Sequence, residues 1–222
     1  MQEMSNDEAF AYILGALRDG SICIDKMPGK YTNYQLGFQS VSKGWIQEIA
    51  KIIEYLYGVK PQFGKVAKSR PIYWRCRVSN KKIVTELLVD SGFVAPQREW
   101  VTPKQIMTAK TDVKRAYISG FFDAEGGFSR SSTNKAWNAG IWQAWNNNKR
   151  CPPLDDIESI LESEGIETNR ITVKEGRISP LFCLRITKKE SLRKFCNFVS
   201  LLHPKKYGLQ QRIIGLVHTK AP

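Results

Sequence analysis

Two related stretches of sequence decide the fold: AYILGALRDGSI at residues 11–22 and AYISGFFDAEGGF at residues 116–128. Each begins with apolar residues at helical spacing and ends in an acid followed by glycine, Asp19–Gly20 in the first and Glu125–Gly126 in the second. Within each stretch, an alanine and a glycine four residues apart form a narrow stripe, which allows two helices to approach toward the short end of the usual ~8–10 Å separation. We therefore expect the two helices to pack together and to bring the two carboxylates to one place.

The same order of elements is predicted after each stretch. In the first copy we expect a helix capped by Asp7 and ending at Gly20, strands 21–26 and 32–41, a helix at 44–57, strands 62–68 and 72–79, and a helix at 81–89. In the second copy we expect a helix at 112–124, strands 127–132 and 137–145, a helix at 154–164, strands 168–174 and 181–187, a helix at 191–202, and a short helix at 207–217. The order predicts an α+β protein of two αββαββα repeats, 1–95 and 112–222, joined by a linker at 96–111 that lacks periodicity.

Composition restricts the class of protein. Lys plus Arg is 34 and Asp plus Glu is 21, which gives a formal charge of +13 and favours a polyanionic partner. The 42% hydrophobic content argues against disorder, and five scattered cysteines without a CxxC pair argue against a zinc site. The sequence has no run of about 18 apolar residues and begins with polar and acidic residues, so we expect no membrane segment and no signal peptide. An intracellular protein is expected, cytoplasmic in a prokaryote.

The paired acids predict a cation site. A helix C-terminus carries about half a negative charge, and here each end also carries a carboxylate. Mg²⁺ suits two carboxylates, because it fills its other positions with water and phosphate oxygens and can promote phosphodiester cleavage. The alternative is an ordinary packing stripe with solvated acids beyond it. We disfavour that alternative because both stretches are in register with the duplication.

The second stretch resembles the LAGLIDADG signature of homing endonucleases. ISGFFDAEG at residues 118–126 matches it in length, in Gly120, in Asp123 and in the acid–glycine end. Two copies about a hundred residues apart are similar to the single-chain members of that family. The resemblance implies repeats joined at the signature helices, a saddle of two antiparallel sheets in the DNA major groove, and metal binding by Asp19 and Glu125.

The first copy departs from the signature by one residue. Gly15 lies four residues before Asp19, whereas Gly120 lies five residues before Glu125. One residue is a rotation of about 100° on an α-helix. The spacing therefore argues against an equivalent packing role for Gly15.

Two basic residues occupy matching positions after the last helix of each repeat. Family members usually place a basic residue near the active centre from this segment, and Arg98 and Lys206 both lie two residues after a proline. The resemblance makes them candidates for polarising the scissile phosphate or its water. The alternative is a pair of charged loops.

The strands predict a basic surface. Ile72, Trp74, Cys76 and Val78 alternate with polar residues, so one face of this strand is expected in the core and the other outside. Arginine, lysine and amide side chains on such a face can pair with base edges or phosphates, although a merely solvated face has the same composition. The candidate DNA contacts are Gln35, Gln39, Lys65, Lys68, Tyr73, Arg75, Arg77, Arg130, Asn138, Gln143, Arg170, Thr172, Lys174 and Arg185.

The sequence thus favours a monomeric pseudo-dimer that cleaves both strands of a long, pseudo-symmetric double-stranded DNA site with Mg²⁺. The main alternative is a non-catalytic protein of the same fold, either an RNA maturase that assists intron splicing or a DNA-binding regulator. A basic RNA-binding protein outside this family is a third possibility, which would leave the paired stretches as coincidence.

Overall fold

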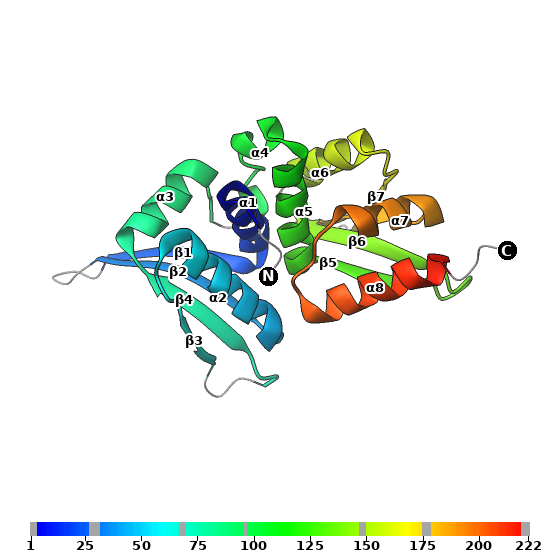
Figure 1. Ribbon diagram of the computed structural model, residues 1–222. Coiled ribbons are helices and arrows are strands. Elements are labelled where there is room, and N and C mark those ends of the chain that lie inside the picture. Colours follow the sequence, from blue (N-terminus) through cyan, green and yellow to red (C-terminus); the bar gives the residue numbers. More distant parts are fainter. Residues whose placement is uncertain are drawn as a thin grey trace.

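The computed structural model of the chain describes residues 4–26, 32–66, 70–95, 97–146, 150–174 and 179–218. Helices α1 (Asn6–Ala16) and α5 (Thr111–Glu125) lie side by side at its centre, with one sheet on either side of them (Figure 1). Helix α1 begins two residues earlier than predicted. Its N-cap is Ser5 rather than Asp7, because Ser5 and Glu8 form a capping box in which the Ser5 amide donates to the Glu8 carboxylate at 3.0 Å.

The first repeat forms a four-stranded antiparallel sheet covered by helices. Its elements are β1 (Gly20–Lys26), β2 (Thr32–Ser40), α2 (Lys43–Tyr57), β3 (Gln62–Lys65), β4 (Trp74–Ser79) and α3 (Lys81–Ser91). The strand order is β1-β2-β4-β3. Leu36 and Phe38 of β2 are buried. Cys76 and Val78 of β4 are buried as the alternation predicted, but Ile72 precedes β4 and is 55% exposed. The prediction of a core position for Ile72 is therefore wrong.

The second repeat has the same order of elements and ends in an additional helix. Its elements are β5 (Gly126–Arg130), β6 (Trp137–Ala144), α6 (Pro152–Ser163), β7 (Asn169–Lys174), β8 (Leu181–Ile186), α7 (Lys189–Phe198) and α8 (Pro204–His218). The strand order β5-β6-β8-β7 repeats that of the first sheet. The α+β class and the duplicated αββαββα order are confirmed.

The segment between the repeats contains structure that the sequence did not predict. A short 3₁₀ turn, η2 (Gln97–Glu99), is followed by a one-turn helix, α4 (Lys104–Thr108). The division of the chain at 96–111 stays a prediction. None of the helices in the described part of the chain is long and apolar enough to cross a membrane.

The signature helices approach to backbone contact at both glycines. A Cβ atom on Gly120 would lie 2.1 Å from the Tyr12 carbonyl oxygen, and one on Gly15 would lie 2.1 Å from the Tyr117 carbonyl oxygen. The expectation that Gly15 has no equivalent packing role is therefore wrong. Helix α1 ends in a 3₁₀ turn of three residues, η1 (Leu17–Asp19). A 3₁₀ helix turns about 120° per residue, roughly 20° more than an α-helix. Over three residues this adds about 60°, which replaces part of the rotation of about 100° that the first signature loses by being one residue shorter.

Candidate catalytic centre and nucleic-acid interface

The two acids from the signature helices share one site. Asp19 is the last residue of η1 and Glu125 the last residue of α5, so each lies immediately before the first strand of its repeat. Asp19 is exposed at the surface, but the protein atoms around its carboxyl still displace enough water to raise its pKa to about 6. Burial, together with the negative charge of Asp19, raises the pKa of Glu125 to about 7. The repulsion means that the two carboxylates lie within electrostatic reach of each other.

Lys206 of α8 lies beside these acids. Its ammonium donates to the carbonyl oxygens of Phe122 at 2.8 Å and of Asp123 at 2.6 Å, in the last turn of α5. Burial lowers the pKa of Lys206 to about 8, against the opposing effect of Asp123, Glu125 and Asp19. Lys206 therefore supplies positive charge to the C-terminal end of α5, where the helix dipole and the Glu125 carboxylate are both negative.

Asp123 holds the chain segment that carries Lys206. It is 1% exposed and accepts from the Tyr12 hydroxyl at 2.6 Å and from the amides of Leu202 at 2.7 Å and His203 at 3.1 Å. Burial raises its pKa to about 6, although these hydrogen bonds act in the opposite direction. Asp123 thus fixes the connection before α8 to both signature helices. The sequence marked Asp123 only as part of the signature, because its partners on α1 and before α8 are about 110 and 80 residues away, respectively.

Arg18 is a buried cation that no pattern in the sequence predicted. It is 4% exposed, donates to the Trp100 carbonyl at 2.6 Å and to the Tyr117 hydroxyl at 3.2 Å, and lies 4.3 Å from the centre of the Trp100 ring. Its charge lowers the pKa of Glu125, against the larger effect of burial. No local pattern identifies Arg18, since its partners come from the linker and from the other signature helix.

Arg98 is directed to the second repeat. Its guanidinium donates to the Ser179 hydroxyl at 2.9 Å, and that hydroxyl donates to Asn146 at 2.9 Å. In the described part of the chain, no hydrogen bond or ion pair joins Arg98 to Asp19 or Glu125. Arg98 is thus bonded to the second repeat, whereas Lys206 is bonded to the end of α5 that carries Glu125.

The open face of the first sheet carries most of its predicted DNA contacts. Gln39 pairs with Arg75 and Gly37 with Arg77, and the residues between them are the buried core positions. Arg75, Arg77, Gln35 and Gln39 therefore share the face that is not covered by helices, and Tyr73 lies just before β4 on the same alternation. Lys65 pairs with Trp74, on the opposite face. Its ammonium lies 5.5 Å from the Trp74 ring centre. The expectation that Lys65 shares the surface of Arg75 is wrong, and Lys68 lies outside the described residues.

The second sheet divides its predicted contacts between two faces. Asn138 and Arg185 lie on the open face, because the residues beside them, Ala139, Leu184 and Ile186, are buried. Arg170 pairs with Leu184 on the core side, where it forms ion pairs with Asp155 and Glu158 of α6. The prediction that Arg170 contacts DNA is wrong. The alternation in β7 is shifted by one residue from that expected, and such a shift moves every side chain to the other face.

Three further candidates also lie on the core side of this sheet. Gln143 is 7% exposed and pairs with Phe182 on the neighbouring strand. Thr172, on the edge strand, pairs with the same phenylalanine. Arg130 pairs with Trp137, whose ring centre is 4.9 Å from the guanidinium. Their assignment to the open face is wrong. Lys174 follows a register shift in β7, and its side chain lies outside the described residues.

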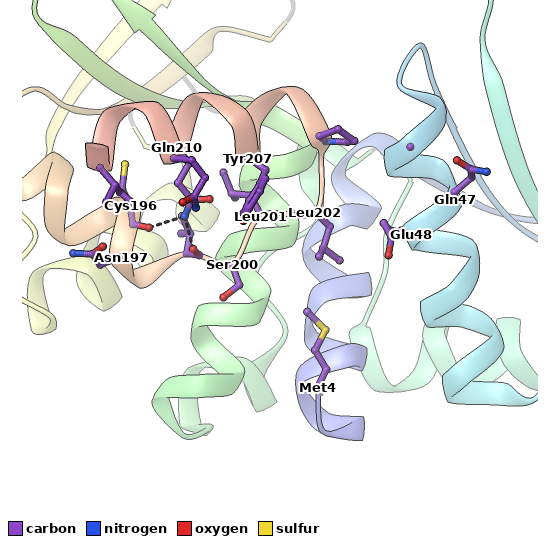
Figure 2. Close-up of a pocket in the computed structure, with 15 residues that line it drawn as sticks. Met4, Gln47, Glu48, Cys196, Asn197, Ser200, Leu201, Leu202, Tyr207 and Gln210 are labelled. Carbon is purple, nitrogen blue, oxygen red and sulfur yellow. Dashed lines mark hydrogen bonds between the residues drawn. The ribbon is translucent and has the colours of Figure 1, made fainter. Parts of the chain in front are cut away.

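Two cavities border the central helices. One, of about 510 Å³, is lined by residues that include Gly126, Gly127, Phe128, His203 and Lys206, next to the end of α5. The other, of about 700 Å³, lies between α2 and the α7–α8 unit, and Figure 2 shows Met4, Glu48, Tyr207 and Gln210 around it. Gln210 donates there to the Cys196 carbonyl at 2.6 Å, which closes the turn between α7 and α8. Neither cavity is lined by Asp19 or Glu125.

The donor set fits a hard divalent cation. Within the described residues, no group of three or more His, Cys, Asp or Glu side chains could hold a metal ion. Two carboxylates with pKa values raised to about 6 and about 7 do fit such a cation, because its charge offsets their repulsion and water and phosphate oxygens can complete its coordination. Asp19 and Glu125 are the residues that would hold it.

Comparisons with known proteins agree with the resemblance to the LAGLIDADG family. Residues 112–199 match the family model described as a LAGLIDADG-like domain. The homing endonuclease I-ApeI of Aeropyrum pernix is 26% identical over 214 residues, which cover 93% of this chain and 87% of that protein. The resemblance predicted from the signature is confirmed.

Solved structures share the fold over nearly the whole chain. A structure of I-DmoI in complex with DNA and Ca is 22% identical, with a TM-score of 0.65, and the match covers 94% of this chain and 100% of that one. A structure of an I-SmaMI mutant is 12% identical, with a TM-score of 0.59, and the match covers 98% of this chain and 92% of that one. The saddle of two sheets about paired helices is therefore confirmed as the fold.

Proposed function

We propose that this LAGLIDADG-family protein is a site-specific homing endonuclease that makes a divalent-metal-dependent double-strand break in a long, pseudo-symmetric DNA target. The convergence of Asp19 and Glu125 carries the proposal. One acid comes from each repeat, so the centre is complete only when both repeats are present. The similar proteins I-ApeI and I-DmoI are homing endonucleases, and the I-DmoI structure with DNA and Ca supports the same class of substrate and cofactor.

We further propose that the cofactor is Mg²⁺, held by Asp19 and Glu125. When bound, such an ion can activate water and stabilise the leaving oxygen of a phosphodiester. Lys206 contributes positive charge beside both acids, and its pKa of about 8 leaves the ammonium largely protonated at neutral pH. Asp123 keeps Lys206 in this position through the amides of Leu202 and His203. A role for Arg98 beside the acids stays a prediction, and its guanidinium donates here to Ser179.

Binding of DNA rests on the open sheet faces and on charge. The net charge of +13 attracts a polyanion in a salt-dependent manner, and Arg75, Arg77, Gln39, Asn138 and Arg185 offer hydrogen-bonding groups suited to the major groove. The two faces differ in sequence, so the two half-sites of the target should differ as well. We propose that the protein acts as a monomer, since each chain contains both halves of the centre.

A cleavage assay tests the proposal. The preferred site is selected from a library of random duplexes, inserted into a plasmid and incubated with the protein in Mg²⁺ or in EDTA. We expect a linear product with Mg²⁺ only. Asp19→Asn and Glu125→Gln should each abolish most cleavage and retain specific binding, because each removes a charge and little contact surface. Asp112→Asn at the exposed N-terminal end of α5 is the matched control and should cleave normally.

Two outcomes would contradict the proposal. Full cleavage by either acid variant would remove Asp19 or Glu125 from the centre. Specific binding by the wild type without cleavage in any divalent cation would indicate a non-catalytic protein of the same fold.

A further inference from the structure

The strand register defines equivalent positions on the two open sheet faces. Gly20 follows the acid of the first repeat and pairs with Phe38, whereas Gly126 follows the acid of the second and pairs with Ile141. Counting one residue beyond these partners makes Gln39 of β2 equivalent to Trp142 of β6. Both lie the same number of residues from the signature acids along the sheet, so they should face equivalent base pairs of the two half-sites.

One row of paired residues differs in chemistry between the sheets. In the first sheet this row is Gln39–Arg75–Gly64, and in the second it is Trp142–Cys183–Ile171. The neighbouring row keeps its chemistry, with Gly37–Arg77–Gln62 in the first sheet and Gly140–Arg185–Asn169 in the second. The second repeat thus replaces hydrogen-bonding side chains by apolar ones in a single row of an otherwise similar surface.

Glycines make room for Trp142 on the open face. A Cβ atom on Gly140 would lie 2.8 Å from two carbons of the Trp142 ring, and one on Gly127 would lie 3.5 Å from a third. The indole therefore lies over Gly140 and beside Gly127. Cys183 is fully buried although its strand position faces outward, whereas Ile171 is 36% exposed and Trp142 partly exposed. Trp142 and Ile171 are the apolar groups of this row that a ligand can reach.

We propose that Trp142 and Ile171 read the C5-methyl group of thymine in the half-site bound by the second repeat. The inference rests on the proposed function, because it requires the open face to lie in the major groove. There the thymine methyl is the one apolar group among hydrogen-bonding base edges, and apolar side chains contact it. Gln39 and Arg75, in contrast, present groups that pair with the polar edges of bases. The two half-sites should therefore differ in chemistry at equivalent positions.

Replacing thymine by uracil tests the methyl contact without changing any hydrogen bond. Affinity is measured for the selected site and for duplexes in which each thymine in turn is replaced by uracil. For the wild type we expect a loss of roughly fourfold at one or two adjacent positions of the second half-site, the factor for one methyl group withdrawn from a buried contact. The equivalent positions of the first half-site should show no such loss.

Two variants of the same residue complete the test. Trp142→Gln installs the side chain that Gln39 provides in the first repeat. In this variant, replacing thymine by uracil in the second half-site should no longer lower the affinity. Trp142→Phe keeps an apolar ring and should retain the discrimination, which separates methyl reading from a general loss of structure. A melting curve checks that each variant is folded.

Three results would overturn the inference: a selected site without thymine in this row, a wild type indifferent to uracil throughout the second half-site, or an unchanged uracil effect in Trp142→Gln. The absence of any preferred DNA site would instead contradict the proposed function itself.

Discussion

Gly120→Ala tests whether the fold depends on backbone contact between the signature helices. The added Cβ would lie 2.1 Å from the Tyr12 carbonyl oxygen and 2.9 Å from the Ala16 nitrogen, where ordinary contact begins at 3.4 Å. The helices would have to separate by about 1.3 Å, the difference between 3.4 Å and 2.1 Å. Both obstructing atoms belong to the backbone, so no side chain can rotate away. We expect a loss of at least about 3 kcal/mol, at the upper end of the range for overpacked cores.

Equilibrium denaturation measures this loss, and a second glycine provides the control. Gly208 lies within α8 and has no atom within 4 Å of a Cβ atom added there. Gly208→Ala should therefore leave stability unchanged or raise it by up to about 1 kcal/mol, through helix propensity alone. For a chain of this size, a loss of about 3 kcal/mol corresponds to a melting temperature lower by roughly 6–12 °C. If Gly120→Ala unfolds within about 0.5 kcal/mol of the wild type, the helices do not pack as described.

Three other predictions address charge. Lys206→Met should slow single-turnover cleavage more than it weakens DNA binding, because it removes the ammonium beside the acids. Equal effects on the cleavage rate and on DNA affinity would assign Lys206 to binding. The raised pKa values of Asp19 and Glu125, about 6 and about 7, destabilise the metal-free protein as pH rises from about 4 to 7. Mg²⁺ should therefore raise the melting temperature more at pH 8 than at pH 5.5, where protons compete, and an equal or larger rise at pH 5.5 would refute the site. Arg75→Ala should relax the preference for one base pair by about 1–3 kcal/mol. Arg170→Ala should lower the stability of the protein and leave its DNA affinity unchanged, because Arg170 pairs with Glu158. A loss of DNA affinity in Arg170→Ala, without such a loss in Arg75→Ala, would return Arg170 to the interface.

The sequence predicted the duplication because its signals are local. The acid–glycine ends, the helical spacing of apolar residues and the alternation in β4 can all be read within a dozen residues. The 3₁₀ turn after Ala16 was not predicted, since it arises where the end of α1 adjusts to a helix about a hundred residues away. Its effect is to bring Asp19 toward Glu125 despite the missing residue in the first signature.

Alternation alone did not settle which face of the second sheet is open. Arg170 was expected outside because Ile171 beside it is apolar, but β7 is an edge strand. An inward-pointing arginine at such an edge can reach carboxylates of a covering helix, as Arg170 reaches Glu158 at 2.6 Å. Arg18 and Asp123 were missed for a related reason. Each is polar and buried, and each is hydrogen-bonded to partners about 80 or more residues away, so no spacing along the chain identifies either.

Direct measurement of metal binding tests the central claim, that Asp19 and Glu125 form one divalent-cation centre across the two repeats. The binding of Mn²⁺, which reports by electron paramagnetic resonance, is titrated for the protein on its selected DNA, with Asp19→Asn, Glu125→Gln and Asp112→Asn in parallel. Wild type and Asp112→Asn should bind Mn²⁺ alike, and each of the other two variants should bind it at least about tenfold more weakly. Unchanged Mn²⁺ binding in Glu125→Gln or Asp19→Asn would show that the two acids do not hold the ion together.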